Sequence, residues 1–314
     1  MFFPFLSLFL GIAFLVYGGR NVVTYSVDLA IKLKVSELFI GIVVIGLGTS
    51  LPELFFTSYV SLEGFYDLAV GGIIGSNIAN TLLVFCLMLI FINDNYKYEN
   101  INQWDIYWMI FSTIFLSLFI FNGKIDDVWP IFFIILLVLF YIHSFRGSRV
   151  ISTQQTSDFS YIRISGGLVF GFLLLYLGTY SFIYGTKAIG HIFAIPDGIL
   201  GLSIAAIGTS APELLVTIIS IRKGSENLAI GNIIGSNITN IFGVLGLSSL
   251  LVRLVNDDSI VISEIFTKIH LMVLIISSII VLFIVRVKPV GVLRKSFGYL
   301  GLISYALYIS YILI

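Results

Sequence analysis

Long apolar runs alternate with short polar connections along the chain. A helix needs roughly 20 apolar residues to cross a bilayer. Ten runs approach or reach that length, at residues 3–27, 38–62, 68–92, 104–122, 128–143, 164–186, 196–221, 228–252, 266–285 and 296–314. The runs are continuous and do not alternate with period two, so they predict helices and not a β-barrel. We therefore expect an all-α integral membrane protein with ten transmembrane helices.

The composition agrees with an integral membrane protein. Of its 314 residues, 58% are hydrophobic and only 11% are charged, whereas soluble domains carry about 25% charged residues. The net charge is zero, and the one cysteine, Cys86, excludes an internal disulfide framework. We expect the lipid bilayer as a partner, and neither nucleic acid nor a protein partner.

The basic residues predict the orientation of the chain. With ten spans, the side that holds both termini carries four Lys and Arg residues, and the opposite side carries thirteen. Cytoplasmic loops are enriched in Lys and Arg. The prediction is a multi-pass protein of the cytoplasmic membrane with both termini on the extracytoplasmic side.

Two polar motifs occur twice, with the same spacing. "GTSLPEL" at 48–54 returns as "GTSAPEL" at 208–214, and "GGIIGSNIAN" at 71–80 returns as "GNIIGSNITN" at 231–240. This predicts a first five-helix repeat at 1–143, a cytoplasmic linker at 144–163 and a second repeat at 164–314. Because five is odd, the second repeat is inverted. Inverted repeats are typical of secondary transporters, which bind their substrate near the midplane on interrupted helices. Here those are expected to be the second, third, seventh and eighth spans.

Proline and glycine predict where the helices are interrupted. Pro52 and Pro212 lack an N–H group and disturb the preceding turn, next to Gly48 and Gly208. We expect the carbonyl groups of residues 46–48 and 206–208 to lose helical partners. Such groups are costly in lipid unless protein, water or an ion satisfies them.

The side chains around these breaks are oxygen donors. Glu53 lies four residues after Thr49, so the two share a helix face, and Glu213 repeats this with Thr209. Ser76 with Asn80, and Ser236 with Asn240, form matching rows on the third and eighth spans. No His, Cys or Met joins them, which favours calcium or sodium over zinc, copper or iron. A single buried Glu can serve only to pair with a Lys, but two copies in inverted repeats favour a functional site.

The paired "G-T-S-x-P-E" and "G-S-N-I-x-N" motifs resemble those of the calcium/cation antiporter superfamily, which includes the sodium/calcium exchangers. The chain looks like a short prokaryotic member. The resemblance implies that Glu53 and Glu213 are the central carboxylates and that Thr49 and Thr209 complete a calcium site. It implies one sodium site with Ser50, Ser76 and the Gly46 carbonyl, and a mirror site with Ser210, Ser236 and the Ala206 carbonyl. Asn80 and Asn240 would complete the middle, and the first and sixth spans would slide against the other eight.

One position departs from the family pattern. Asn240 stands where well-understood exchangers carry an aspartate, so the site has two formal negative charges. The leading hypothesis is an antiporter, not an enzyme, that exports Ca²⁺ in exchange for Na⁺ without a cofactor. Proton-coupled or K⁺-dependent exchange, or exchange of another cation, is the alternative. A channel is disfavoured because the chain carries its own pseudo-symmetry, and no H-E-x-x-H motif supports a hydrolase.

Overall fold

The computed structural model describes residues 2–94, 96, 98, 101–126, 128–148, 159–192, 208–267 and 269–312. These residues are almost entirely helical. The first half contains α1 (Phe2–Leu33), α2 (Glu37–Ile40), η1 (Gly41–Ile45), α3 (Gly46–Thr49), α4 (Leu51–Leu62), α5 (Tyr66–Ala79), η2 (Asn80–Val84), α6 (Phe85–Phe91), α7 (Gln103–Asn122) and α8 (Trp129–Gly147). The second contains α9 (Tyr161–Ile192), α11 (Ala211–Arg222), α12 (Glu226–Ile238), η4 (Thr239–Leu245), α13 (Gly246–Asn256), η5 (Glu264–Thr267), α14 (Ile269–Val287) and α15 (Gly291–Ile312). A two-residue strand β1 (Lys124–Ile125) pairs antiparallel with β2 (Ile260–Val261).

The expected all-α membrane class is confirmed. Among the described residues, seven helices are long and apolar enough to cross a membrane. An eighth crossing is complete if Glu37–Thr49 and Leu51–Leu62, which meet at a 41° bend, form one span. The helix α15 coincides with most of the tenth predicted run. The seventh run is represented by α11, because its first part lies outside the described residues.

The third and eighth predicted spans are interrupted in a different way from the second. Residues Tyr66–Phe91 and Glu226–Asn256 each form one continuous helix. Each contains a π-helical segment, η2 or η4, in its middle. Such segments are rare and frequently occur at functional sites. Asn80 begins η2, and Asn240 is the second residue of η4, so both predicted ligands lie where the helical winding changes.

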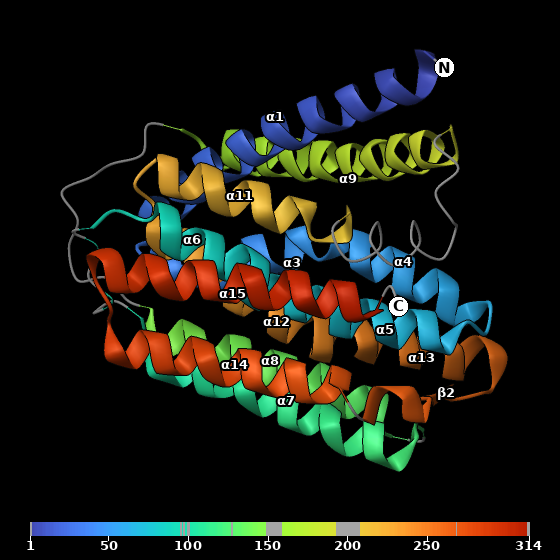
Figure 1. Cartoon of the computed structure of the whole chain (residues 1–314). Helices are drawn as coiled ribbons and strands as arrows, with labels where there is room; N and C mark the ends of the chain where they lie inside the picture. Colours follow the sequence, from blue (N-terminus) through green and yellow to red (C-terminus); the bar gives the residue numbers. More distant parts are fainter. Residues whose placement is uncertain are drawn as a thin grey trace.

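The helices pack in a layered bundle (Figure 1). The long helices α1 and α9 lie side by side along one edge, and α7, α8 and α14 gather at the opposite edge. Helices α4, α5, α11 and α12 lie between them. Helices α1 and α9 approach closely at glycines: a Cβ on Gly18 would lie 2.8 Å from the carbonyl oxygen of Gly171. At this point the two helices therefore touch backbone to backbone.

Small residues also bring α12 against the broken second span. A Cβ on Gly235 would lie 2.2 Å from the Ile42 carbonyl oxygen, and one on Gly231 would lie 2.3 Å from that of Leu38. Only a residue without a side chain fits there. This contact places the polar residues of α12 beside Gly46.

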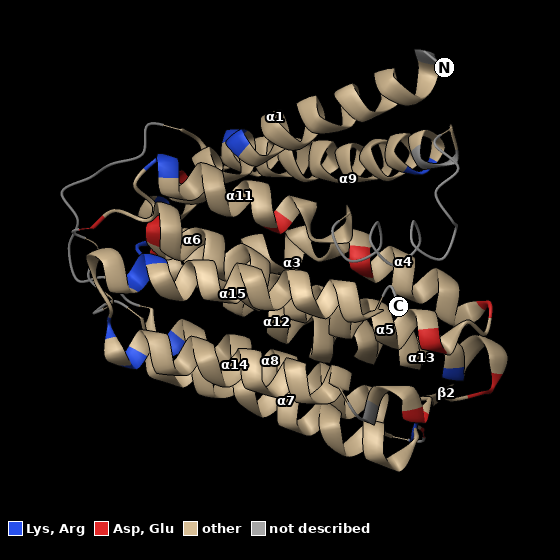
Figure 2. Cartoon of the chain, viewed as in Figure 1, with Lys and Arg blue, Asp and Glu red and all other residues tan. Residues whose placement is uncertain are grey.

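Charged residues concentrate away from the middle of the bundle. Most Lys and Arg gather at the end opposite the start of α1 (Figure 2). One basic residue there is buried: Arg294, at the start of α15, is 1% exposed. Its guanidinium donates to the Asn93 carbonyl at 2.8 Å and to the Asp94 carboxylate at 2.6 Å. It therefore ties α15 to the connection that follows α6.

Candidate cation site

The two "GTSxPE" motifs break their helices in the same way. Ser50 has φ −80° and ψ 1°, and Ser210 has φ −84° and ψ 5°, a sparsely populated region of backbone space. Each serine precedes a new helix, α4 or α11, whose second residue is Pro52 or Pro212. Proline is tolerated there because the first N–H groups of a helix have no internal partner. The two prolines thus begin helices that carry Glu53 and Glu213 in their first turns.

The expectation of freed carbonyl groups needs a correction at Gly46. Its carbonyl accepts a hydrogen bond from the Ser50 N–H at 3.3 Å and lies 3.4 Å from the Ser236 hydroxyl. The backbone turn continues to Ser50 before it breaks, so the Gly46 carbonyl keeps a helical partner. Ala206, the corresponding residue of the second motif, lies outside the described residues.

The two glutamates are buried without a countercharge. Glu53 is 3% exposed and Glu213 is fully buried. Neither takes part in an ion pair among the described residues. The two carboxyl groups are close enough to repel each other. Two like charges in an apolar interior are costly unless a cation or protons compensate them.

The carboxylate oxygens also lack well-formed hydrogen bonds. None of the four has a partner of ordinary geometry among the described residues. Hydroxyl groups lie beside them nonetheless, that of Thr209 next to Glu53 and those of Thr49 and Ser236 next to Glu213. Buried polar atoms are almost always bonded in folded proteins, so these oxygens need a partner such as a proton, water or a cation.

Hydroxyl pairs link the two repeats across the site. The Thr49 and Ser236 hydroxyl oxygens are 3.1 Å apart, and those of Ser76 and Thr209 are also 3.1 Å apart. A shift of 160 residues turns one pair into the other. The expected grouping of Ser50 and Ser76 with the Gly46 carbonyl in one sodium site stays a prediction. Ser236 lies beside Gly46, and each pair combines a threonine of one repeat with a serine of the other.

Asparagines fill the centre between the π-helical segments. The Asn77 amide donates to the Asn237 carbonyl at 3.1 Å, and the Asn240 amide donates to the Asn77 side-chain oxygen at 3.1 Å. Within the part of the chain that the structure describes, the side-chain oxygen of Asn240 and both polar side-chain atoms of Asn80 have no partner. Asn80 and Asn240 are fully buried, so both oxygens remain available to a ligand.

One residue of the network escaped the sequence analysis. Asn232 is fully buried on α12 and contacts both broken helices. Its side-chain oxygen lies 3.1 Å from the Thr49 hydroxyl, and its amide nitrogen lies 3.3 Å from the Glu213 carbonyl oxygen. A signal was present, since Asn232 replaces Gly72 in an otherwise nearly identical repeat motif.

The chemistry of the site is that of a hard cation. Its donors are carboxylate, hydroxyl, amide and carbonyl oxygens, which Ca²⁺ and Na⁺ prefer. The described residues contain no group of three or more His, Cys, Asp and Glu side chains that could hold a metal. A site with two carboxylates and neutral oxygens suits an ion that binds reversibly.

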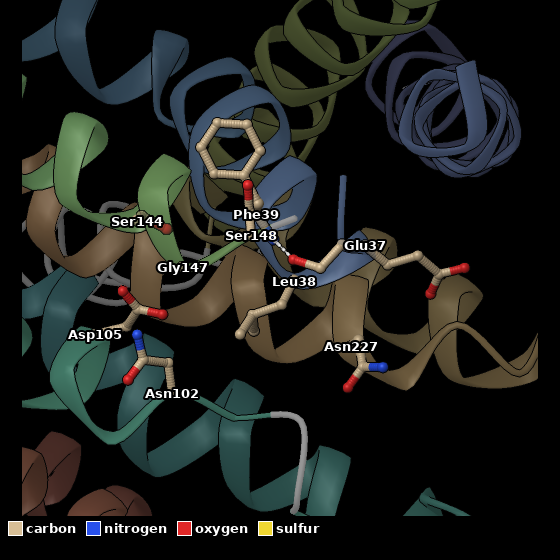
Figure 3. Close-up of a pocket in the computed structure, with 10 residues that line it drawn as sticks. Glu37, Leu38, Phe39, Asn102, Asp105, Ser144, Gly147, Ser148 and Asn227 are labelled. Atoms are coloured by element: carbon tan, nitrogen blue, oxygen red, sulfur yellow. Dashed lines mark hydrogen bonds between the residues drawn. The ribbon is translucent and has the colours of Figure 1, made fainter. Parts of the chain in front are cut away.

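A surface pocket lies elsewhere, where the start of α2 meets the start of α7 and the end of α8. It has a volume of about 370 Å³. Glu37 and Asn227 lie on one side of it, and Asp105 and Asn102 lie on the other (Figure 3). The pocket contains none of the predicted cation ligands, so it is separate from the buried carboxylates.

Comparison with known proteins identifies the family. The family model described as sodium/calcium exchanger protein matches residues 3–146 and 164–314. The chain belongs to the sodium/calcium exchanger family. The resemblance noted from the duplicated motifs is thereby confirmed. Because the family consists of ion exchangers, this places the protein among membrane transporters and not among enzymes.

Relatives of this exchanger family cover most of the chain. The sodium/calcium exchanger MaX1 of Methanosarcina acetivorans is 30% identical over 289 residues, covering 78% of this chain and 82% of the relative. The inner membrane protein YrbG of Escherichia coli is 31% identical over 256 residues, with 78% of each chain covered. The structure of the exchanger NCX_Mj, soaked with 100 mM Na⁺ and 10 mM Sr²⁺, matches with a TM-score of 0.82 and 25% identity over 98% of both chains.

Proposed function

We propose that this exchanger exports Ca²⁺ from the cytoplasm in exchange for Na⁺ by alternating access. Glu53 and Glu213 would form the shared cation site, with Thr49 and Thr209 as further calcium ligands. Ser50, Ser210, Asn80 and Asn240 would add the remaining oxygens, and the hydroxyls of Ser76 and Ser236, with the carbonyls of Gly46 and Ala206, would line the flanking sodium sites. The observation that carries the proposal is the pair of buried, unpaired carboxylates, one from each copy of the motif.

The proposal includes an inverted-repeat architecture. Residues 1–143 and 164–314 would be five-span repeats, joined by a linker at 144–163. Two features support a two-fold relation between them. Ser50 and Ser210 share one backbone conformation, and the Thr49–Ser236 contact has its counterpart in Ser76–Thr209 at the same distance. With such a relation, two copies of one motif would reach a single central site from opposite sides of the membrane.

Alternating access would come from movement of α1 and α9 against the remaining helices. Their close backbone contact at Gly18 and Gly171 favours movement as one unit. The unit touches both broken spans: Gly48 lies against the Phe172 ring of α9, and Gly19 of α1 lies against Ile219 of α11. A shift of α1 and α9 would therefore uncover one side of the site while it covers the other.

The direction of export rests on the charge distribution. The end with most Lys and Arg (Figure 2) would face the cytoplasm, and both termini would face away from it. The start of α1 and the end of α15 lie toward the opposite end (Figure 1), as this topology requires.

Proton-coupled or K⁺-dependent exchange is the second candidate. Asn240 leaves the site with two carboxylates, and neither has a cationic partner among the described residues. Two protons could neutralise such a pair as two sodium ions would. The same charge count leaves open another transported cation.

One flux experiment separates these candidates. The purified protein is reconstituted into proteoliposomes. The vesicles are loaded with Na⁺, with K⁺, or with a buffer whose pH differs from that outside, and ⁴⁵Ca²⁺ uptake is followed. Uptake driven by an outward Na⁺ gradient alone is the expected result. Uptake that follows a pH gradient and ignores Na⁺ would establish the second candidate. Uptake that needs no ion on the opposite side would contradict exchange altogether.

A further inference from the structure

We propose that Asn232 is a positioning residue of the cation site, whose side-chain oxygen accepts hydrogen bonds from the Thr49 and Ser236 hydroxyls when a cation binds the oxygens of those hydroxyls. This inference rests on the proposed exchange function and adds a role for a residue that the motif comparison did not single out. It is carried by a set of contacts between buried groups on three helices.

The contacts of the Asn232 amide nitrogen fix the orientation of the side chain. The nitrogen lies 3.3 Å from the Glu213 main-chain oxygen and 3.3 Å from the Thr217 hydroxyl oxygen. A main-chain carbonyl can only accept a hydrogen bond, so the NH₂ group must point toward α11. The Asn232 oxygen consequently points toward α3.

That oxygen faces two hydroxyl groups of the site. It lies 3.1 Å from the Thr49 hydroxyl and 3.4 Å from the Ser236 hydroxyl. All three residues are completely buried, so water cannot easily replace these contacts. The Asn232 oxygen is thus an acceptor that both hydroxyls can share.

This acceptor matters because a hydroxyl can bind a cation only through its lone pairs. With the site empty, Thr49 and Ser236 lie beside the Glu213 carboxyl group, where their protons can point toward its oxygens. A cation at Glu213 would repel those protons. They must then turn to other acceptors. The Asn232 oxygen is the one that both hydroxyls reach. The Ile45 carbonyl oxygen, 3.0 Å from the Thr49 hydroxyl, and the Gly46 carbonyl oxygen, 3.4 Å from the Ser236 hydroxyl, are acceptors for one hydroxyl each. Groups behind the ligands commonly set ligand orientation and are worth 10–100-fold in metal affinity.

The other half of the site has no asparagine at the position that corresponds to Asn232. The counterpart of Asn232 is Gly72, which has no side chain that could accept a hydrogen bond from Thr209 or Ser76. A Cβ at Gly72 would meet the Phe56 ring at 3.7 Å, an ordinary contact, so the glycine is not enforced by close packing within the described residues. The two half-sites therefore differ chemically at this position, with an amide in one and no side chain in the other.

The test compares two substitutions of Asn232 in purified full-length protein, with ⁴⁵Ca²⁺ equilibrium binding and Na⁺ competition as readouts. Asn232→Ala removes the acceptor and should weaken Ca²⁺ binding about 10–100-fold. Asn232→Asp keeps an acceptor oxygen and should bind Ca²⁺ at least as tightly as the wild type. Asn227→Ala is the matched control, because Asn227 lies at the start of the same helix, where its side-chain oxygen accepts a hydrogen bond from the Tyr96 hydroxyl at 2.8 Å.

The outcomes distinguish the possible roles of the residue. If Asn232 acted only through its NH₂ contacts, Asn232→Asp would bind Ca²⁺ as weakly as Asn232→Ala, since both variants lose the donor to the Glu213 main-chain oxygen. That result would overturn the proposal. Binding by Asn232→Ala within twofold of the wild type would overturn it as well. Loss of the Asn232→Ala effect in a Thr49→Val background would support it, because the amide acts through that hydroxyl. Wild-type protein that binds no cation would instead overturn the proposed function itself.

Discussion

Replacement of Glu213 by glutamine should stop calcium transport while leaving the fold intact. Glutamine has nearly the same shape as glutamate but removes one of the two charges that neutralise Ca²⁺. Among the described residues, Glu213 forms no ion pair, and its carboxylate oxygens form no ordinary hydrogen bond. The substitution therefore removes no ion pair or hydrogen bond of this kind from the folded protein. The substitution should therefore stabilise the empty protein, because two like charges no longer repel in the interior.

The size of the effect on transport follows from the charge left on the loaded site. With Ca²⁺ bound to one carboxylate, the site carries one net positive charge as the helices move past it. An uncompensated charge within the bilayer costs about 2.5–3.5 kcal/mol on the lower published scale. Added to the barrier of the conformational step, this slows exchange by roughly 70–400-fold, before any loss of binding is counted. The same argument applies to Glu53→Gln.

The assay is initial-rate ⁴⁵Ca²⁺ uptake into Na⁺-loaded proteoliposomes, with equal amounts of reconstituted protein. The control is Glu63→Gln, which removes a carboxylate from the exposed end of α4 and should leave uptake within about twofold of the wild type, as surface changes usually do. Thermal unfolding in detergent should show Glu213→Gln to be at least as stable as the wild type. Uptake by Glu213→Gln at more than a third of the wild-type rate would refute the role given to this carboxylate.

Further predictions concern packing and charge. Gly235→Val should destabilise the protein by about 1–3 kcal/mol or more, because its Cβ would lie 2.2 Å from the Ile42 carbonyl oxygen; thermal unfolding measures this, with Gly72→Ala as the control that should unfold near the wild-type temperature. Two carboxylates neutralise one Ca²⁺ or two monovalent cations, so exchange should be electroneutral, and a K⁺ diffusion potential set with valinomycin should leave the ⁴⁵Ca²⁺ rate unchanged. Asn240→Asp adds a third carboxylate and should make that rate respond to the potential; a potential-sensitive wild type would contradict the charge count.

The parts of the molecule that depend on local sequence could be predicted. Apolar runs located the helices, because lipid demands continuous apolar surface. Pro52 and Pro212 located the breaks, because proline acts on its own turn. Each of these features depends on a few neighbouring residues and therefore leaves a pattern in the sequence.

Features that depend on distant residues could not be predicted in this way. The combination of Thr49 with Ser236 depends on how two spans nearly 190 residues apart cross, and helix periodicity does not determine that crossing. The π-helical segments that include Asn80 and Asn240 leave no signal in the pattern of apolar residues. Arg294 was counted among the loop charges, yet it is buried against Asp94 through a contact 200 residues away. In each case the sequence contains the residue, but its pattern does not show which distant residue it contacts.

The distribution of unpartnered buried atoms argues that the site evolved to hold an ion. Leaving a buried polar group without a partner costs about 1–3 kcal/mol, so a fold accumulates few without compensation. Three pairs of residues related by the 160-residue repeat carry such atoms: Ser50 and Ser210, Glu53 and Glu213, and Asn80 and Asn240. Among the other described residues with unpartnered buried atoms, no two are related by the repeat. Chance packing defects would not follow the repeat, whereas ligands of a cation bound between two copies of one motif would.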